Sequence, residues 1–416
     1  MRVLWIVNTI FPPPAKALGL STGVSGGWML DFAYQLPQNG IELAVASFYN
    51  GDTVVQTAID GITYFLLPGG SKRMMFYHKD NERLWAEVVH SFHPQLVHIH
   101  GTEYTHGLAF LRAYGEIPAV VSVQGVLKRI AEVYDGGLTM KELVKFRTLK
   151  EYLHLNGTIE QKLLMKKNAK YEHELLNRVK YAHVINTWDC SVTKQINDRL
   201  QIFKHDFNLR PEFYTAEKWD YDNCRPYSIL TGQCSTPLKG LHMLLKAVAI
   251  VKKQLPQITL TVTGATPDSG YMRYIISLID SLGLKGQVEF AGPKSGADMI
   301  KLMKTANTVV VPSAIEGTSM FLREAMFLGV PSVSSFRGGM ADYIKDGING
   351  FVYDYAEYPF LAQRLTELLT NKEMQKSFSD WAIIQSELHH DRQKNLTATL
   401  SMYQEIENKN YGKDGF

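Results

Sequence analysis

Two glutamates, Glu316 and Glu324, are separated by seven residues that include Thr318 and Ser319, residue types that cap helices. A carboxylate accepts hydrogen bonds from hydroxyl groups, and the first amides of a helix favour an anion. The pattern therefore suits a ligand that carries both hydroxyls and phosphate. A glycosidase pair needs carboxyls roughly 5 to 10 Å apart, whereas this spacing gives roughly 12 Å of helical rise. An isolated pair of this kind is more often a solvated helix residue and a loop charge.

The residues around this pair predict a strand, a loop, a helix and a second strand. An apolar, β-branched run covers Thr308–Val311, which is typical of a strand buried on both faces of a parallel sheet. The helix-forming run MFLREAMFL follows and stops at Gly329, and another apolar run covers residues 330–333. Glu316 is therefore predicted in the loop after a strand, and Glu324 in the helix.

This segment resembles the donor-binding region of the retaining glycosyltransferases of family 4, also called glycosyl transferases group 1. The shared features are PSAIEG, a second glutamate eight residues after the first, EAM, GVPSV, a GG pair and DGING. They extend over more than forty consecutive positions, which is far more specific than a single glycine motif. The resemblance implies the GT-B fold and metal-independent, retaining transfer from a nucleotide-diphosphate sugar of the UDP or GDP type, with no further cofactor.

The resemblance also implies roles for individual residues. Glu316 would contact the hydroxyls of the donor sugar, and Glu324 would hold the nucleotide ribose. Lys239, in the loop before a predicted helix, is placed where a cation can meet a pyrophosphate. The other positions expected to line the donor are Gly317, Thr318, Ser319, Met320, Gly264, Gly292 and Pro293.

The sequence departs from the family pattern at three places. The usual EGFGL reads EGTSM, which preserves the backbone donors. Gln233 stands where the family has an arginine, so we expect weaker contact with the donor phosphates unless Arg323 or Arg337 compensates. Gln124 stands where the family has a histidine near the donor sugar, and a glutamine cannot titrate near neutral pH.

A glycine-rich loop after the first predicted strand carries Gly23, Gly26 and Gly27. Glycines between a strand and a helix allow close approach of the backbone to a ligand. Their spacing is not that of the dinucleotide fingerprint, so a nicotinamide cofactor is not expected. The resemblance places Gly26 and Gly27 beside the donor phosphates; the alternative is a surface loop.

Two other motifs raise the question of a metal. His98 and His100 share one face of a predicted strand, but the nearby Glu103 and His106 are weakly placed as further ligands. We interpret His100 and Glu103 as polar residues on the acceptor side. Asp220 and Asp222 form a DxD motif, but this motif lies in a predicted linker. No metal site is therefore expected.

Composition places few limits on function. The chain has 416 residues, 45% apolar and 20% charged, and a net charge of +3, which gives no general indication of nucleic acid. Three cysteines without CxxC spacing favour a reducing cytoplasm. No apolar run suits a signal peptide or a transmembrane helix, so we expect a cytoplasmic protein.

The alternation of strands and helices predicts an α/β protein with two doubly wound parallel sheets that face each other across a cleft. We expect an acceptor-side domain over residues 1–206 and a donor-binding domain over residues 207–380. The resemblance implies that residues 381–416 include a helix that returns to the first domain.

The segment 140–180 is helical in composition and basic, with Leu143, Phe146, Leu149, Leu163, Leu164 and Met165 among its lysines. A basic amphipathic helix can lie on the anionic inner face of a membrane, where a polyprenyl-linked acceptor would be found. The alternative is a solvated helix face above a core stripe.

The expected function is transfer of a sugar to a glycan or lipid-linked acceptor in polysaccharide biosynthesis. A nucleotide-sugar-binding or assembly subunit without its own catalysis is the alternative, because of Gln124 and Gln233. An epimerase of nucleotide sugars is a third hypothesis.

Overall fold

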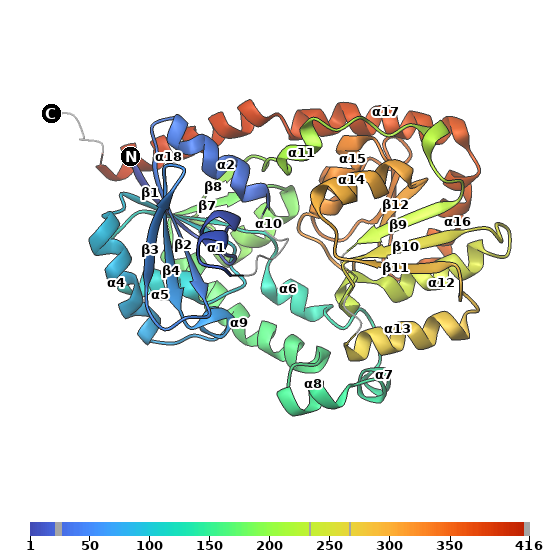
Figure 1. Ribbon diagram of the computed structural model, residues 1–416, viewed down its shortest axis with the longest axis horizontal. Helices are drawn as coiled ribbons and strands as arrows, with labels where there is room; N and C mark the ends of the chain where they lie inside the picture. Colours follow the sequence, from blue (N-terminus) through green and yellow to red (C-terminus); the bar gives the residue numbers. More distant parts are fainter. Residues whose placement is uncertain (21–26, 233, 266–267, 412–416) are drawn as a thin grey trace. The chain divides into compact units, whose positions relative to one another are not determined.

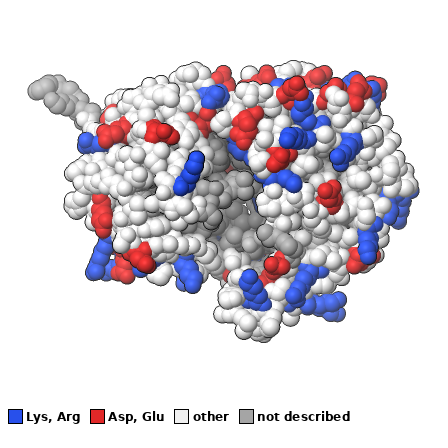
Figure 2. All heavy atoms as spheres, viewed as in Figure 1, with Lys and Arg blue, Asp and Glu red and all other residues white. Residues whose placement is uncertain are grey.

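The computed structural model describes residues 1–20, 27–232, 234–265 and 268–411, and it contains two compact units (Figure 1). The first unit comprises Met1–Lys128, Met165–Arg210 and His390–Phe416, and the second comprises Arg129–Leu164 and Pro211–His389. Side chains of both charges are interspersed over the face shown in Figure 2. None of the described helices combines the length and apolarity needed to cross a bilayer.

The first unit is built on an eight-stranded sheet in the order β3-β4-β2-β1-β5-β6-β7-β8. The strands are β1 Arg2–Ile6, β2 Glu42–Tyr49, β3 Val55–Ile59, β4 Ile62–Pro68, β5 Leu96–His100, β6 Ala119–Ser122, β7 Tyr181–Val184 and β8 Gln201–Lys204. All pairs are parallel except β3 with β4, an antiparallel hairpin at the edge that the expected all-parallel sheet did not include. Leu4 and Ile6 belong to one core cluster and Val3 and Trp5 to another, so β1 is buried on both faces.

The helices that contribute to the first unit are α1 Pro12–Ala17, α2 Gly27–Gln38, α3 Gly70–Met75, α4 Asp80–Phe92, α5 His106–Ala113, α6 Leu127–Glu132, α9 Thr158–Arg178, α10 Thr187–Ile196 and α18 Arg392–Tyr411. Helices α6 and α9 each contain a point where the chain passes from one unit to the other.

The second unit is built on a six-stranded, fully parallel sheet in the order β11-β10-β9-β12-β13-β14. Its strands are β9 Ser228–Gly232, β10 Thr259–Thr263, β11 Val288–Gly292, β12 Thr308–Val311, β13 Ser332–Ser335 and β14 Phe351–Tyr353. Its helices are α7 Met140–Lys145, α8 Leu149–His154, α11 Pro211–Tyr214, α12 Leu241–Val251, α13 Gly270–Ser281, α14 Gly296–Thr305, α15 Met320–Leu328, α16 Tyr358–Leu369 and α17 Lys372–His389, with short 3₁₀ turns η1 Tyr221–Asn223, η2 Pro237–Lys239 and η3 Gly339–Asp342.

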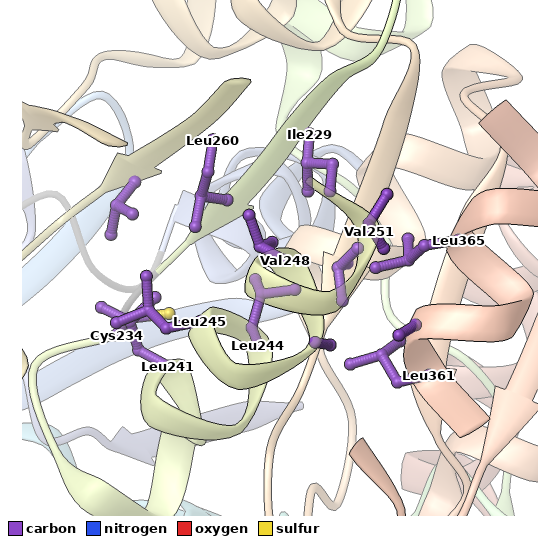
Figure 3. Packing of buried hydrophobic residues seen from close by; sticks show 14 of the residues in the cluster. Ile229, Cys234, Leu241, Leu244, Leu245, Val248, Val251, Leu260, Leu361 and Leu365 are labelled. Carbon is purple, nitrogen blue, oxygen red and sulfur yellow. The ribbon is translucent and has the colours of Figure 1, made fainter. Parts of the chain in front are cut away.

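Helix α12 occupies the centre of the core of the second unit (Figure 3). Its buried side chains Leu244 and Val248 belong to the same cluster as Ile229 and Leu260 of the sheet and Leu361 of α16. The helix is apolar on most of its circumference because it is covered by the sheet on one side and by a helix on the other.

The units differ from the expected domains in residues 129–164, which were assigned to the first domain and group with the second. The ring of Phe146 lies 5.3 Å from that of Tyr274 on α13, and the Gly270 amide donates to Glu151 at 2.9 Å. The Gly136 carbonyl also accepts from Tyr355 Oη at 2.9 Å. These contacts join distant parts of the chain and leave no local signal in the sequence.

The last segment also divides differently from the expectation, because α17 lies in the second unit and only residues from His390 onward belong to the first. Tyr403 on α18 is fully buried in the first unit and accepts from Trp5 Nε1 at 2.9 Å. Arg392 at the start of this helix pairs with the buried Asp31 on α2.

A chain of hydrogen bonds joins α18 to the first sheet through, in order, Trp5, Tyr403, His98, Ser122, His183 and the His205 carbonyl. If His98 and His183 each carry a single proton, on Nε2, every hydrogen bond in this chain has one donor and one acceptor. Both rings are then neutral. Burial lowers the pKa of His98 well below its ordinary value and that of His183 to about 4. Burial and the neighbouring His183 lower the pKa of His205 to about 2.

We predict that the free energy of unfolding falls as pH falls below 6.5. The unfolded chain binds protons at its histidines from about pH 6.5 downward, whereas the folded protein does not until the pH approaches the lowered pKa values. Each such histidine removes up to about 1.4 kcal/mol per pH unit. Urea unfolding at a series of pH values measures this slope.

The matched variants are His205→Gln, whose amide can replace the 3.0 Å contact with Thr399 Oγ1, and His90→Gln at an exposed position. His205→Gln should flatten the pH dependence and His90→Gln should leave it unchanged. Equal slopes for all three proteins would contradict the assignment of neutral buried histidines.

Candidate functional site

Five parallel strands of the second sheet, β9 to β13, end at the same edge, so the loops that follow them are neighbours. Gly264 follows β10 and Gly292 ends β11, and the Gly264 amide donates to the Gly292 carbonyl at 2.9 Å. Both glycines have positive φ, +69° and +68°. Pro293 follows them as an exposed residue. These three predicted donor-site residues therefore lie together beside the ends of β9 and β12.

The loops after β9 and β12 bring Lys239 and Glu316 together. Lys239 Nζ lies 2.8 Å and 3.0 Å from the two carboxylate oxygens of Glu316, across 77 positions of sequence. Both side chains are partly accessible, with 24% and 13% of their surface exposed. The loops are also joined through their backbones, because the Ala314 amide donates to the Leu238 carbonyl at 2.7 Å.

Two glycines make room for this arrangement. A Cβ at Gly240 would lie 1.8 Å from the Pro312 carbonyl oxygen, and one at Gly338 would lie 2.1 Å from the Glu316 carbonyl oxygen. The Glu316 backbone is bound on both sides, since its amide donates to Arg337 at 3.2 Å and its carbonyl accepts from Gly339 at 2.9 Å. The predicted GG pair therefore positions Glu316 through the backbone.

Helix α15 begins directly after this loop. Ser319 is its N-cap, and its Oγ accepts from the Leu322 amide at 3.2 Å. Gly317, Thr318 and Met320 are half-buried around the helix start. The first turn of this helix is thus directed toward the edge that carries Lys239 and Glu316, and the helix dipole favours an anion there.

Glu324 is buried in α15, with 3% of its surface exposed, so it is not the solvated helix residue that an isolated glutamate would suggest. Arg323 is buried as well, and its guanidinium lies 5.3 Å from the centre of the Tyr343 ring. Arg337 pairs with Asp354 at 3.3 Å. Both arginines that were considered as substitutes for the family arginine therefore have contacts inside the unit.

The predicted residues of the first unit lie at the carboxyl ends of two adjacent strands. His100 ends β5 and is buried, Glu103 follows it, and Gln124 follows β6 at an exposed position. Asn8 Nδ2 donates to the Glu103 carboxylate, and burial raises the pKa of this group.

Sequence reasoning missed Glu172 on α9. Its Oε2 accepts from the Leu127 amide at 2.8 Å, and its Oε1 lies 2.5 Å from Thr102 Oγ1, so it joins the loops after β5 and β6. Burial raises its pKa to about 8. The glutamate lies 70 positions from Thr102 within a basic helical segment, so no local pattern distinguishes it.

Some predicted residues lie outside the described part of the chain: Gly23, Gly26 and Gln233. Gly27 is the first residue of α2. The structure therefore does not place the proposed phosphate contacts of the first glycine-rich loop or the residue that replaces the family arginine.

The motifs that raised the question of a metal are engaged in other contacts. Asp220 caps η1, and Asp222 pairs with Lys372 at 2.8 Å. The His98 and His100 rings stack with their centres 3.9 Å apart. Among the described residues, no group of three or more histidine, cysteine or acidic side chains is arranged to hold a metal ion.

We predict that Gly338→Ala destabilises the second unit more than Gly347→Ala. Gly347 also has a positive φ, +74°, but a Cβ there meets nothing within 4 Å, so it should cost only the about 1–2 kcal/mol of a left-handed residue. Gly338→Ala adds a collision with the Glu316 backbone and should cost about 2 kcal/mol more. Urea unfolding compares the two variants, and equal losses would show that Gly338 does not hold the Glu316 loop.

Comparisons with known proteins agree with this geometry. Residues 223–383 match the sequence model of the family described as "Glycosyl transferases group 1". A D-inositol 3-phosphate glycosyltransferase from Salinispora arenicola is 30% identical over 152 residues, which cover 35% of this chain and 34% of the relative. The chain thus matches about a third of the length of this curated relative.

Solved structures match nearly the whole chain. Sucrose-phosphate synthase from Thermosynechococcus elongatus superposes with a TM-score of 0.76 at 14% identity, over 98% of this chain and 99% of the other. HepE from Anabaena, solved with UDP and glucose, gives 0.70 at 16% identity, over 97% and 100%. Residues 223–383 are therefore similar to the glycosyl transferases group 1 family, and the chain has the GT-B fold of two Rossmann-like sheets.

Proposed function

We propose that this chain is a metal-independent, retaining glycosyltransferase that transfers a sugar from a nucleotide diphosphate to a glycan or polyprenyl-linked acceptor. The observation that carries the proposal is the Lys239–Glu316 ion pair at the edge where α15 begins. A sugar nucleotide presents hydroxyls and a diphosphate side by side, and this edge offers a carboxylate, a cation and a helix N-terminus.

The ion pair can bind both parts of the donor. A lysine ammonium has three protons, so Lys239 can keep its contacts with Glu316 and donate to a phosphate oxygen. Each oxygen of Glu316 has a further lone pair that can accept from a sugar hydroxyl. The amides from Gly317 to Met320 would bind phosphate and sugar, Glu324 the ribose, and the turn at Gly264, Gly292 and Pro293 the base.

The chemistry then proceeds by stabilisation of the leaving group. The bond between the anomeric carbon and the phosphate oxygen breaks, and the electron pair leaves with the nucleotide diphosphate, whose charge Lys239 and the α15 dipole stabilise. The acceptor hydroxyl bonds to the same face of that carbon, and its proton passes to the departing phosphate oxygen. Glu316 is held by Lys239 and by hydroxyls in this scheme, so it acts as a positioning and electrostatic group and not as a nucleophile.

We assign the acceptor to the first unit, with His100 and Glu103 as its polar contacts and Gln124 as a hydrogen-bonding group near the reacting sugar. A UDP sugar is the favoured donor, with GDP as the alternative, because HepE of similar fold was solved with UDP and glucose. All three cysteines are free thiols, which is compatible with the cytoplasm, and polysaccharide biosynthesis is the process we propose.

We predict that Glu316→Gln lowers transfer from the donor about 10²-fold or more, because loss of one electrostatic group at a reacting centre has effects of this size. The assay is release of nucleotide diphosphate from UDP and GDP sugars, with and without acceptors. Asp222→Asn, which removes an exposed ion pair with Lys372 in the same unit, is the control and should keep full activity. Near wild-type turnover in Glu316→Gln would remove its assigned role.

We also predict that UDP raises the melting temperature of the wild-type protein and that Lys239→Met removes most of this shift. Ligand stabilisation scales with occupancy, and the variant keeps the side-chain stem while losing the charge that binds phosphate. Uridine without phosphate is the matched ligand and should give a smaller shift that is equal in both proteins. Nucleotide-sugar binding without turnover, even with acceptor, would instead indicate a non-catalytic subunit.

A further inference from the structure

Two helices of the second unit, α7 and α8, contain no buried residue. Together with the turn into α9 they form a segment, residues 139–164, which we call the foot. Its largely exposed apolar side chains are Met140, Val144, Leu149, Tyr152, Leu153, Leu155 and Leu163. Leu149 and Leu153 are 74% and 73% exposed, more than the other exposed large apolar residues described. Large apolar side chains exposed in such number on one short segment are typical of an interaction site.

Two of these residues, Leu149 and Leu163, belong to the apolar set that the sequence pattern indicated, and the other five do not. Leu143 and Phe146 are partly buried and pack against the core of the second unit. The exposed apolar side chains belong to other residues of the same segment. The foot therefore has one apolar side that packs on its own unit and a second that is exposed.

The foot is a fixed part of its unit. Thr139 with Glu142, and Thr148 with Glu151, form complete capping boxes at the starts of α7 and α8. Glu151 also accepts from the Gly270 amide at 2.9 Å on α13. The exposed leucines are thus presented by helices that are anchored at their N-termini.

The backbone at the end of α8 also indicates that the exposed apolar side chains belong to an interaction site. Leu155 has a φ of +49°, a left-handed conformation that costs energy for any residue with a Cβ atom and that glycine usually takes at a helix end. Its side chain is 67% exposed. Packing inside the protein therefore does not offset the cost of the left-handed conformation at Leu155.

The charges of the foot are predominantly positive. Residues 139–164 contain five Lys and Arg against three Glu, a net charge of +2. The glutamates are engaged in the capping boxes and, at Glu160, in a 2.7 Å ion pair with Arg147. Lys141, Lys145 and Lys150 are exposed among the apolar side chains. The surface at α7 and α8 in Figure 2 is accordingly mostly uncharged, with Lys and Arg side chains beside it.

We propose that the foot binds the surface of a bilayer that contains anionic lipids. Leu149, Leu153 and Leu155 would enter the boundary between headgroups and acyl chains, and the lysines would contact headgroup phosphates. A protein partner is less favoured, because exposed leucines with lysines among them match the acyl chains and the headgroup phosphates of a lipid surface.

The membrane contact has a consequence for the donor site. Gly136, just before the foot, lies against the Lys239 loop, since a Cβ there would be 2.3 Å from the Pro237 carbonyl oxygen. His242 and Tyr355 both hydrogen bond to the Gly136 carbonyl, at 3.0 Å and 2.9 Å. Binding by the foot would therefore hold the edge that carries Lys239 near a lipid-linked acceptor. This last statement rests on the proposed function, whereas the membrane contact itself does not.

The test is co-sedimentation of the full chain with vesicles, which needs no turnover. Wild-type protein should bind vesicles of phosphatidylcholine with phosphatidylglycerol, should bind pure phosphatidylcholine more weakly, and should lose affinity as salt rises. Leu149→Ser with Leu153→Ser should lower the partition coefficient about tenfold or more, because two inserted leucines are lost. Both positions are exposed, so the melting temperature should stay unchanged.

The matched control is Ile384→Ser with Leu388→Ser, which removes two exposed aliphatic side chains from α17, 50% and 64% exposed, in the same unit. This variant should bind vesicles like the wild type. Absence of vesicle binding by the wild type, or equal loss in both variants, would overturn the proposal. A self-association that only the foot variant loses, with vesicle binding unchanged, would show that the foot contacts a second copy instead. If the wild-type protein binds vesicles but releases no nucleotide diphosphate from any sugar donor, only the proposed function is contradicted.

Discussion

The ion pair between Lys239 and Glu316 joins two loops that are far apart in sequence and defines the candidate site. A parallel sheet places the ends of β9 and β12 side by side, but the two charged groups meet only because the loop backbones approach each other very closely. Gly240 and Gly338 permit this approach, since any side chain at either position would overlap a carbonyl oxygen. The charges are partly open to solvent, so an incoming ligand can share their hydrogen bonds without breaking into the core.

The helix that follows the Glu316 loop is completely buried after its first residue. Helix α15 has eight consecutive buried residues, from Phe321 to Leu328, and its first turn is fixed against the Glu316 loop. A helix end that moved would not hold amides and dipole at a defined distance from Lys239. In the first unit, α18 is held by a buried chain of hydrogen bonds through His98, His183 and Tyr403, and the lowered pKa of His98 is one reason to expect this unit to lose stability in acid.

Local patterns in the sequence were sufficient for the strand, helix and strand around Glu316, for Ser319 as the helix cap and for the two Rossmann-like sheets, which the structure confirms. These features depend on residues close in sequence, whose apolar spacing and capping types report directly on the backbone.

Other features could not be predicted because they depend on contacts between distant residues. The pairing of Lys239 with Glu316 and the position of Glu172 are of this kind. The grouping of residues 129–164 with the second unit depends on Gly136, Phe146 and Glu151, each of which contacts a residue more than a hundred positions away. The sequence did not predict that Leu143 and Phe146 pack on the second unit while Leu149 is exposed, because α7 and α8 have six residues each, too few for a hydrophobic period to distinguish the two sides.

The most direct measurement is a crystal structure of the chain with a non-hydrolysable analogue of a nucleotide-diphosphate sugar. Our account predicts the diphosphate within hydrogen-bonding distance of Lys239 Nζ and the amides at the start of α15, with Glu316 on the sugar hydroxyls. A diphosphate bound elsewhere on the chain, with the Lys239–Glu316 pair untouched, would contradict it.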